Sequence, residues 1–311
     1  MKNSRHTIAV VGGGMTGSSW AALFAMRGDI VRIVEARPEV AATLKPRIME
    51  MLKQSLGVSN VFGVDRNIEV YSGLEGTLDG VYAIQEAVSE QAELKQQIFA
   101  EIEKHAPPNA LILSSSSAIP ASVAGEQMED PSRLIIGHPF HPPHILPLVE
   151  VVAGPQTDYE LVEKTLAFYR AYGRVPVQLY REVPGFVANR LLGAVVLEAA
   201  DLINRGIVNA GDLDTIITNS LGLRWAAIGP VLAGVLSGMP GGIEQLLKQI
   251  IQPLTDNMGK EPLPDEVIEK ICRQAAIYYP KEEWNDLARR RDQQQGMILK
   301  IQKRTTLSTL E

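Results

Sequence analysis

This sequence lacks disulfide-forming cysteines and long uncharged apolar runs. Its one cysteine, Cys272, excludes a disulfide within the chain, so a reducing cytoplasm is the expected location. Nothing near Cys272 indicates an activated thiol. No run is long and charge-free enough to cross a bilayer, and the first apolar run, "TIAVVG", is short enough to predict a strand rather than an export signal.

An excess of positive charge is also absent. The 30 Lys and Arg residues are outnumbered by 36 Asp and Glu residues, and the resulting net charge of −6 argues against a broad nucleic-acid surface. The short cluster Arg289, Arg290 and Arg291 is expected on a solvated helix face. The expected partner is therefore a small molecule rather than a nucleic acid or a membrane.

The first half alternates short β-branched runs with helical patterns, as successive βαβ units do. Helices are expected over residues 15–27, over a stretch ending near Leu56, and over residues 92–105. The predicted strands are "TIAVVG", "IVRIVE", "GVYAIQEAV", "ALILSSSS", "RLIIGH" and "LPLVEVV". This alternation predicts an α/β domain with a Rossmann-type, doubly wound and largely parallel sheet.

A glycine fingerprint lies between the first strand and the first helix. "VVGGGMTG" contains G-x-G-x-x-G, and its context after a strand and before a helix makes the pattern informative. Such a loop brings the backbone and a helix N-terminus to a pyrophosphate. The predicted dinucleotide-binding residues are Gly12, Gly14, Met15, Thr16 and Gly17.

The second strand ends at Glu35, where a carboxylate can accept hydrogen bonds from ribose hydroxyls and repel a 2′-phosphate. Arg37 lies close enough to soften that preference and is included among the cofactor-binding candidates. We expect NAD rather than NADP.

Helical patterns dominate after "EVPGF" at residues 182–186. Because the chain has 311 residues, more than a single hydrophobic core usually supports, we predict two domains. Residues 1–184 form the NAD-binding Rossmann domain, and residues 185–311 form an all-α domain for substrate binding and dimerisation. The segment 186–206 is apolar on nearly every side, which predicts a helix buried by its neighbours and by a partner subunit.

Three histidines, His138, His141 and His144, lie in "GHPFHPPHILPLVEV". Their spacing would align them on a helix, but the three prolines between His138 and His144 forbid one. In an extended chain, a spacing of three directs successive side chains to opposite faces. No metal site is therefore expected.

Proton transfer is the alternative role for this stretch. Two predicted strands flank a proline-rich connection, and a chain that returns near His144 places His138 opposite Glu150. A carboxylate paired with an imidazole fixes its tautomer and stabilises its protonated form, as a general base requires. From spacing alone, an equal alternative is that Glu150 only caps the strand or lies at an edge of the sheet.

Taken together, the motifs resemble the L-3-hydroxyacyl-CoA dehydrogenase superfamily, and within it the lambda-crystallin or L-gulonate 3-dehydrogenase branch. The likeness spans essentially the whole chain. It is carried by the glycine loop, "IQEAVSEQAELK", "ILSSSS", "GHPFHPPHILPLVEVV", "VPGFVANRLL", "GIVNAGDLD" and "LGLRWAAIGP". The resemblance implies NAD-dependent hydride transfer and supports a homodimer.

The resemblance also implies individual roles. The catalytic His–Glu pair of the family falls on His138 and Glu150, and its active-site serine, which touches substrate and nicotinamide, falls on Ser117. The glutamate and lysine near the nicotinamide ribose fall on Glu90 and Lys95. Ser117 has a structural alternative, because its four-serine run is also typical of a polar turn, and Lys95 has the alternative of a solvated helix residue.

The family's asparagine in the first long helix of the second domain falls on Asn189, and Arg224 is the candidate partner for a substrate carboxylate. Asn189 has the alternative of satisfying backbone groups, and Arg224 that of an interface stack with Trp225. The chain departs from the family at His141, where the family usually has a substrate-binding asparagine. A second departure is "IMEMLKQSLGVSN", whose single lysine, Lys53, offers few cations to CoA phosphates.

We therefore expect an NAD-dependent dehydrogenase that oxidises the 3-hydroxy group of a small polar hydroxy acid, L-gulonate-like or carnitine-like. Two alternatives stay open. One is a true L-3-hydroxyacyl-CoA dehydrogenase, and the other is a non-catalytic, crystallin-like NAD-binding protein.

Overall fold

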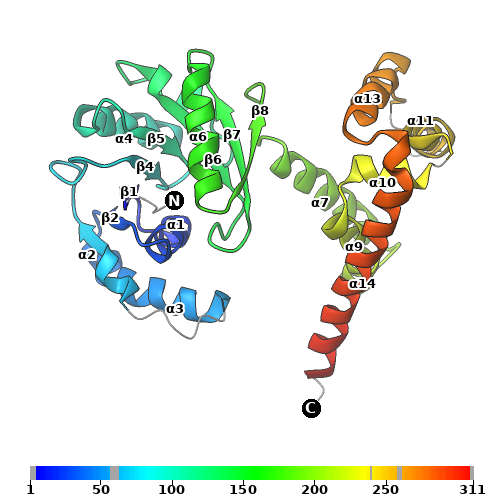
Figure 1. The fold of residues 1–311 in the computed structure, drawn as a ribbon, viewed down its shortest axis with the longest axis horizontal. Coiled ribbons are helices and arrows are strands. Elements are labelled where there is room, and N and C mark those ends of the chain that lie inside the picture. Colours follow the sequence, from blue (N-terminus) through cyan, green and yellow to red (C-terminus); the bar gives the residue numbers. More distant parts are fainter. Residues whose placement is uncertain (1–4, 57–62, 239, 258–260, 309–311) are drawn as a thin grey trace. The chain divides into compact units, whose positions relative to one another are not determined.

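The computed structural model describes residues 5–56, 63–238, 240–257 and 261–308. The chain divides into two compact units, Met1–Val195 and Val196–Glu311 (Figure 1). The division falls inside helix α7 (Ala188–Asn204). The boundary expected at Pro184 and Gly185 stays a prediction.

The first unit is built on one eight-stranded sheet in the order β3-β2-β1-β4-β5-β6-β7-β8. All neighbouring strands are parallel except β6 and β7, which are antiparallel. This confirms the predicted doubly wound, largely parallel sheet. The strands are β1 (Thr7–Val11), β2 (Ile30–Val34), β3 (Ile68–Tyr71), β4 (Ala83–Glu86), β5 (Leu111–Ser114), β6 (Leu134–Pro139), β7 (Leu148–Ala153) and β8 (Val175–Leu179).

The two strands that the sequence patterns missed, β3 and β8, are the two edges of the sheet. Neither has the run of buried side chains that marks the central strands, because an edge strand is covered on fewer sides. Only the first residue of β3, Ile68, is fully buried, and β8 has no fully buried residue.

Helices cover both faces of the sheet, and alternate side chains of β1 show how. Ile8 and Val10 point into a core shared with α1 (Met15–Met26), α3 (Leu44–Leu56) and α6 (Tyr159–Ala171). Ala9 and Val11 point into a second core shared with α4 (Ala92–His105) and α5 (Ala121–Ala124). Between α1 and α3, the short helix α2 (Pro38–Ala41) follows β2.

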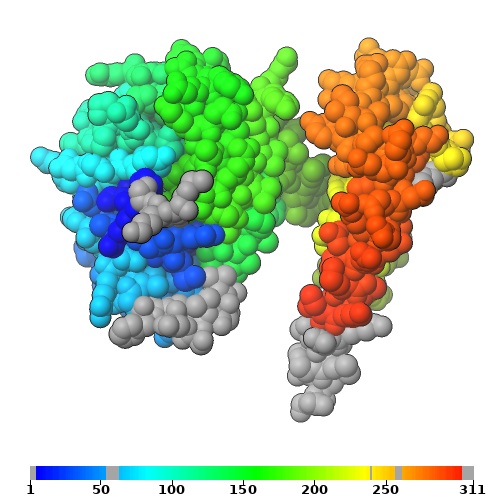
Figure 2. All heavy atoms as spheres, in the orientation of Figure 1, coloured from blue at the N-terminus to red at the C-terminus, as the bar shows by residue number. Residues whose placement is uncertain are grey.

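The second unit is helical throughout its described residues. Its core lies among α10 (Pro230–Ser237), α11 (Gly242–Leu246), the π-helical turn η3 (Leu247–Ile251), α13 (Asp265–Tyr278) and the start of α14 (Trp284–Ser308). The remaining helices are α8 (Ala210–Thr218), α9 (Leu221–Ala227) and α12 (Gln252–Asn257). Figure 2 shows the surface of α14, in red, on the drawn face of this unit.

The basic cluster of α14 is engaged with carboxylates of the same helix. Arg289 and Arg290 pair with Asp286, and Arg291 pairs with Asp292. The guanidinium charges are thus largely balanced within the helix, as expected of a solvated helix face.

The prediction that the apolar helix at 186–206 is buried on all sides is wrong for the single chain. None of the residues of α7, α8 or α9 is fully buried, and Leu197 of α7 is 74% exposed. The buried side chains of the second unit's core lie in α10, α11, η3 and α13, and none of them lies in α7, α8 or α9. Burial by a partner subunit is the part of the prediction that stays open.

Among the described residues, no single helix is long and apolar enough to cross a membrane, although α8 and α9 together with α10 reach that length and composition across a bend of 97°.

Candidate active site

A cavity of about 480 Å³ opens at the carboxyl ends of the parallel strands, where α/β sheets usually bind ligands. All of its lining residues belong to the first unit. They are Thr16, Ala87, Val88, Glu90, Ser115, Ser117, His138, Pro139, Phe140, His141, Asn189 and Leu192. The cavity therefore gathers the glycine-loop helix, the serine run, the histidine stretch and the start of α7.

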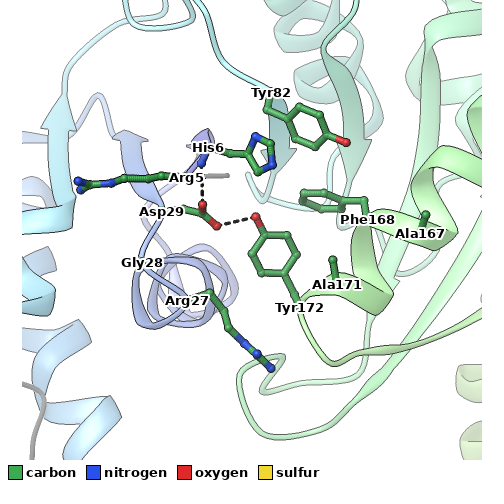
Figure 3. A pocket seen from close by; sticks show the side chains of 10 residues that line it. All are labelled: Arg5, His6, Arg27, Gly28, Asp29, Tyr82, Ala167, Phe168, Ala171 and Tyr172. Carbon is green, nitrogen blue, oxygen red and sulfur yellow. Dashed lines mark hydrogen bonds between the residues drawn. The ribbon is translucent and has the colours of Figure 1, made fainter. Parts of the chain in front are cut away.

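A second cavity of about 410 Å³ lies at the opposite, amino end of the strands (Figure 3). Asp29 accepts hydrogen bonds there from the backbone N–H of His6, at 2.8 Å, and from the Tyr172 hydroxyl, at 2.6 Å. Figure 3 shows Arg5 and Arg27 directed away from this centre. Its polar groups tie β1, α1 and α6 together rather than converge on a ligand.

The glycine loop has the shape that a dinucleotide requires. Gly12 has φ of +105°, and a Cβ there would lie 2.6 Å from the Ala87 carbonyl oxygen. A Cβ on Gly17 would lie 1.9 Å from the Gly12 carbonyl oxygen, so the close packing of α1 on β1 needs glycine. A Cβ on Gly14 would meet nothing within 4 Å, which leaves open space beside the N-terminus of α1. Met15 and Thr16 follow directly, and Thr16 lines the cavity.

Glu35 lies at the end of β2 with both carboxylate oxygens engaged. One accepts from the backbone N–H of Gly13 at 3.0 Å, and the Arg37 guanidinium spans both at 2.8 and 3.0 Å. Led by the hydrogen bond from the Arg37 side chain and opposed by burial, these contacts lower the pKa of Glu35 to about 2. The carboxylate is therefore ionised, as a ribose-binding acceptor must be, and Arg37 is its direct partner.

One residue near the loop had no signal in the sequence. Arg47 of α3 donates to the Gly13 carbonyl and, at 2.7 Å, to the Ser18 hydroxyl. It fixes the glycine loop from the α3 side. The stretch "IMEMLKQSLGVSN", whose single lysine offers few cations to CoA, begins directly after Arg47, and its residues 57–60 lie outside the described residues.

The four serines after β5 have distinct environments. Ser114 donates to Glu86 at 2.6 Å, Ser115 accepts from Gln85 at 2.8 Å, and Ser116 donates to Glu90 at 2.6 Å. Ser117 follows them on the cavity wall, and its backbone N–H donates to Glu90 at 2.8 Å. Ser114 and Ser116 thus support the turn, and Ser115 and Ser117 both line the cavity.

Lys95 lies behind Glu90 rather than on the cavity wall. Its side chain is 1% exposed, and its ammonium is 2.8 Å from Glu86 and 3.2 Å from Glu90. Burial alone would raise the pKa of Glu90, but the hydrogen bonds from Ser116 and the backbone of the turn, with the Lys95 charge, lower it. Glu86 was missed by the sequence analysis. Contact of Glu90 and Lys95 with the cofactor stays a prediction.

His138 and Glu150 are direct partners across β6 and β7, in the register expected from the sequence. His138 Nδ1 is 2.8 Å from Glu150 Oε2, and both side chains are at most 5% exposed. The backbone N–H groups of Val187 and Ala188 each donate to Glu150 Oε1 at 3.0 Å. Burial opposes ionisation of Glu150, but the hydrogen bonds from His138, Ala188 and Val187 outweigh it and lower its pKa.

Phe186 completes this arrangement and was not foreseen. It has a left-handed backbone with φ of 48°, rare for an aromatic residue, directly after Gly185 at φ of 76°. Its fully buried ring lies 5.4 Å from the His138 ring, centroid to centroid. The turn thus presents the next two backbone N–H groups to Glu150 while its ring packs on the imidazole.

The three histidines have different environments. His138 pairs with Glu150, His141 lines the cavity, and His144 is buried against Ser19. Within the described ranges, no group of three or more His, Cys, Asp or Glu side chains is placed to hold a metal ion.

The remaining predicted residues divide between the units. Asn189, in the first turn of α7, lines the cavity and donates from its amide to the Ser117 carbonyl at 3.2 Å. Arg224 lies in α9 of the second unit and is exposed beside Trp225. The structure therefore brings together the glycine-loop helix, Ser117, His138, His141, Glu150 and Asn189, and the substrate role of Arg224 stays a prediction.

Comparison with known proteins agrees with this geometry. Residues 7–183 match the model of the 3-hydroxyacyl-CoA dehydrogenase NAD-binding domain, and residues 185–272 match that of the 3-hydroxyacyl-CoA dehydrogenase C-terminal domain. A 3-hydroxyacyl-CoA dehydrogenase of Gibberella moniliformis is 40% identical over 253 residues, which are 80% of this chain and 79% of that protein.

Two further relatives carry other names. An L-carnitine dehydrogenase of Streptomyces griseus is 35% identical over 86% of this chain and 82% of its own length. A lambda-crystallin homolog of Bos taurus is 37% identical over 72% of each chain. The resemblance seen in the motifs is confirmed, and NAD is the cofactor of its first domain. The chain belongs to the 3-hydroxyacyl-CoA dehydrogenase family.

Proposed function

We propose that this protein oxidises the 3-hydroxy group of a small polar hydroxy acid with NAD, and that His138 is the general base. The observation that carries the proposal is the buried His138–Glu150 pair on the wall of a cavity shared with the dinucleotide loop. A protein that only binds NAD needs no such pair.

The pair is arranged for proton transfer. An ionised Glu150 carboxylate can only accept a hydrogen bond. The proton between Glu150 Oε2 and His138 Nδ1 therefore belongs to Nδ1, and Nε2 of His138 is left as the basic nitrogen. His138 then takes the hydroxyl proton at Nε2, and Glu150 stabilises the imidazolium. NAD, when bound, supplies the hydride acceptor. Ser117 and Asn189, which line the same cavity, orient the reacting oxygen.

The lining of the cavity supports a small free acid. Among its described residues none is Lys or Arg, and its ionisable groups are Glu90, His138 and His141. The several phosphate charges of a CoA ester would find few cations here. His141 is exposed on the wall where the family usually has asparagine, and its imidazole can donate to a substrate oxygen or carboxylate.

The family relatives favour two different substrate classes. The name of the Streptomyces griseus relative refers to a free hydroxy acid, L-carnitine, whereas that of the Gibberella moniliformis relative refers to acyl-CoA. Oxidation of 3-hydroxyacyl-CoA is therefore the second candidate. Because another relative is a lambda-crystallin homolog, a non-catalytic NAD-binding protein is the third candidate, and the same test covers it.

We also propose a homodimer. The uncovered side chains of α7 to α9 make an apolar surface of a kind that usually marks a protein interface. In the second unit they include Val196, Leu197, Ile216 and Trp225.

A substrate panel followed by NADH absorbance tests the reaction. L-gulonate, L-carnitine and other free hydroxy acids are compared with 3-hydroxybutyryl-CoA. We expect turnover of a free acid and a loss of about a hundred- to ten-thousand-fold in kcat for His138→Ala, with NADH binding kept. His105→Ala is the matched control, because His105 pairs with Glu101 on α4, outside the cavity lining.

Each other outcome is informative. A strong preference for the CoA ester would establish the second candidate. No turnover of any panel member despite tight NADH binding would favour a binding protein. A His138→Ala enzyme that oxidises its substrate at the wild-type rate would refute the proposed base.

A further inference from the structure

A buried pair of side chains joins the glycine-loop helix to the histidine stretch. Ser19 Oγ is 2.6 Å from His144 Nδ1, and the backbone N–H of His144 donates to the same oxygen at 3.0 Å. Ser19 is fully buried and His144 is 5% exposed. The two residues are 125 positions apart, so this is a tertiary contact between α1 and the connection of β6 to β7.

That connection forms part of the wall of the candidate site. It carries Phe140 and His141, which both line the cavity. Arg174 holds its far side through the carbonyls of Pro143, at 2.7 Å, and Leu146, at 3.3 Å. His144 lies between Pro143 and Leu146 in the sequence and is not among the lining residues. It therefore affects the cavity wall only through the position of this connection.

The other end of the contact lies in the first turns of α1. Two adjacent serines have separate tasks there. Ser18 donates to the Gly13 carbonyl at 3.3 Å and accepts from Arg47, so it holds the loop toward α3. Ser19 contacts His144 instead. The helix whose N-terminus receives the dinucleotide phosphates is thus attached directly to the wall that carries His141.

The chemistry of the pair favours a neutral imidazole. Burial lowers the pKa of His144, and the charges of His141 and Arg174 act in the same direction. When the ring is neutral, one hydrogen bond joins Ser19 Oγ and His144 Nδ1, and its donor depends on the tautomer of the ring. Ser19 Oγ also accepts from the backbone N–H of His144. The pair is then a fixed two-point attachment rather than a group available for catalysis.

We propose that Ser19 and His144 form a positioning pair that couples dinucleotide binding on α1 to the placement of the His141 wall. This inference rests on the proposed function for its substrate arm only. By linkage, a cofactor that fixes α1 also fixes the wall, so removal of the pair weakens cofactor and substrate binding together and leaves the proton-transfer step in place.

The test combines Ser19→Ala, His144→Ala, the double variant and His144→Asn. NADH affinity is measured by fluorescence, and kcat and KM are measured with the substrate found in the panel. Loss of a buried hydrogen bond predicts a rise of about 5- to 100-fold in both the NADH Kd and the substrate KM, with kcat little changed. The double variant should be no worse than either single variant, because both remove the same contact.

Two variants separate positioning from folding. His144→Asn keeps a polar atom near the Nδ1 position and should restore most of the affinity lost in His144→Ala. Ser18→Ala makes the same chemical change one residue away and should weaken NADH binding without raising the substrate KM. Additive losses, an asparagine as damaging as alanine, or a raised NADH Kd with an unchanged KM would overturn the proposal.

Amide hydrogen exchange gives an arm that needs no turnover. At saturating NADH, the wild-type segment 140–147 should exchange more slowly than without NADH, and Ser19→Ala should lose that protection although its loop is saturated. If no substrate is found, the proposed function fails while this arm still decides the coupling. Absence of protection in the wild-type protein would overturn the coupling alone.

Discussion

Glu150 receives three donors on two oxygens, and this fixes both its charge and the tautomer of His138. The hydrogen bonds outweigh burial and lower its pKa in the folded protein. A lowered folded pKa means that the stabilisation by Glu150 is complete above its ordinary value of 4.5 and is lost as the pH falls through the lower folded value.

Glu150→Gln should keep the shape of the site but lose the carboxylate that stabilises the imidazolium. We expect kcat to fall by about a hundred- to ten-thousand-fold with NADH affinity within a few-fold of wild type. The dependence of unfolding free energy on pH below 4.5 should also become shallower, as chemical denaturation at several pH values would measure. Retained kcat would show that His138 works without this partner.

Glu35 and Arg37 are the residues that we expect to select NAD over NADP at the end of β2. Glu35→Gln removes the charge that repels a 2′-phosphate and releases Arg37 to attract it. We expect the NADH Kd to rise by about 10-fold or more, as for loss of a charge-assisted hydrogen bond, while NADPH binding improves. Fluorescence titration with both nucleotides measures this. Glu39→Gln, a nearby acid on α2, is the control, and an unchanged ratio of the two affinities would contradict the assignment.

At the scale of elements, the buried ion pairs at Lys95 hold the turn between β5 and α5. Glu86 at the end of β4 and Glu90 before α4 both meet the Lys95 ammonium, and Glu90 in turn fixes the backbone of Ser117. Lys95 of α4 thus holds Glu90 in place, and Glu90 in turn holds the backbone of Ser117 on the cavity wall.

Lys95→Met leaves two carboxylates facing each other without a cation. We expect a loss of about 3–5 kcal/mol in unfolding free energy, the usual cost of breaking a buried pair, together with a fall in kcat/KM. Lys104→Met is the matched control, because Lys104 pairs with Glu101 on the exposed side of the same helix. A stability loss no larger than that of the control would show that the buried pair is not structural.

At the scale of the whole molecule, the uncovered apolar surface of α7 to α9 predicts association. Light scattering should give about twice the chain mass of 34.0 kDa. Leu197→Glu should shift the protein toward the monomer, because a charge on that surface opposes its burial. Ile277→Glu is the control, since Ile277 is equally exposed at 75% but lies on α13. A monomeric wild-type protein would contradict the proposed homodimer.

Local patterns determined much of this protein. Alternating β-branched runs set the central strands, the glycines of the loop set the dinucleotide turn, and the spacing from His138 to Glu150 matched the register of β6 and β7. Each depends on neighbours in sequence or on a strand period of two, so the pattern could be read directly. The edge strands β3 and β8 were not predicted, because most of their side chains are only partly buried and give no clear pattern.

Tertiary structure alone decided how distant groups meet. No sequence period links Ser19 to His144, Arg47 to Gly13, or Lys95 to two glutamates, because such contacts depend on how whole helices pack on the sheet. The exposure of α7 was likewise decided by packing: its apolar residues predicted burial, but the core of the second unit formed among other helices. The sequence identified the candidate site residues, and packing set what each of them contacts.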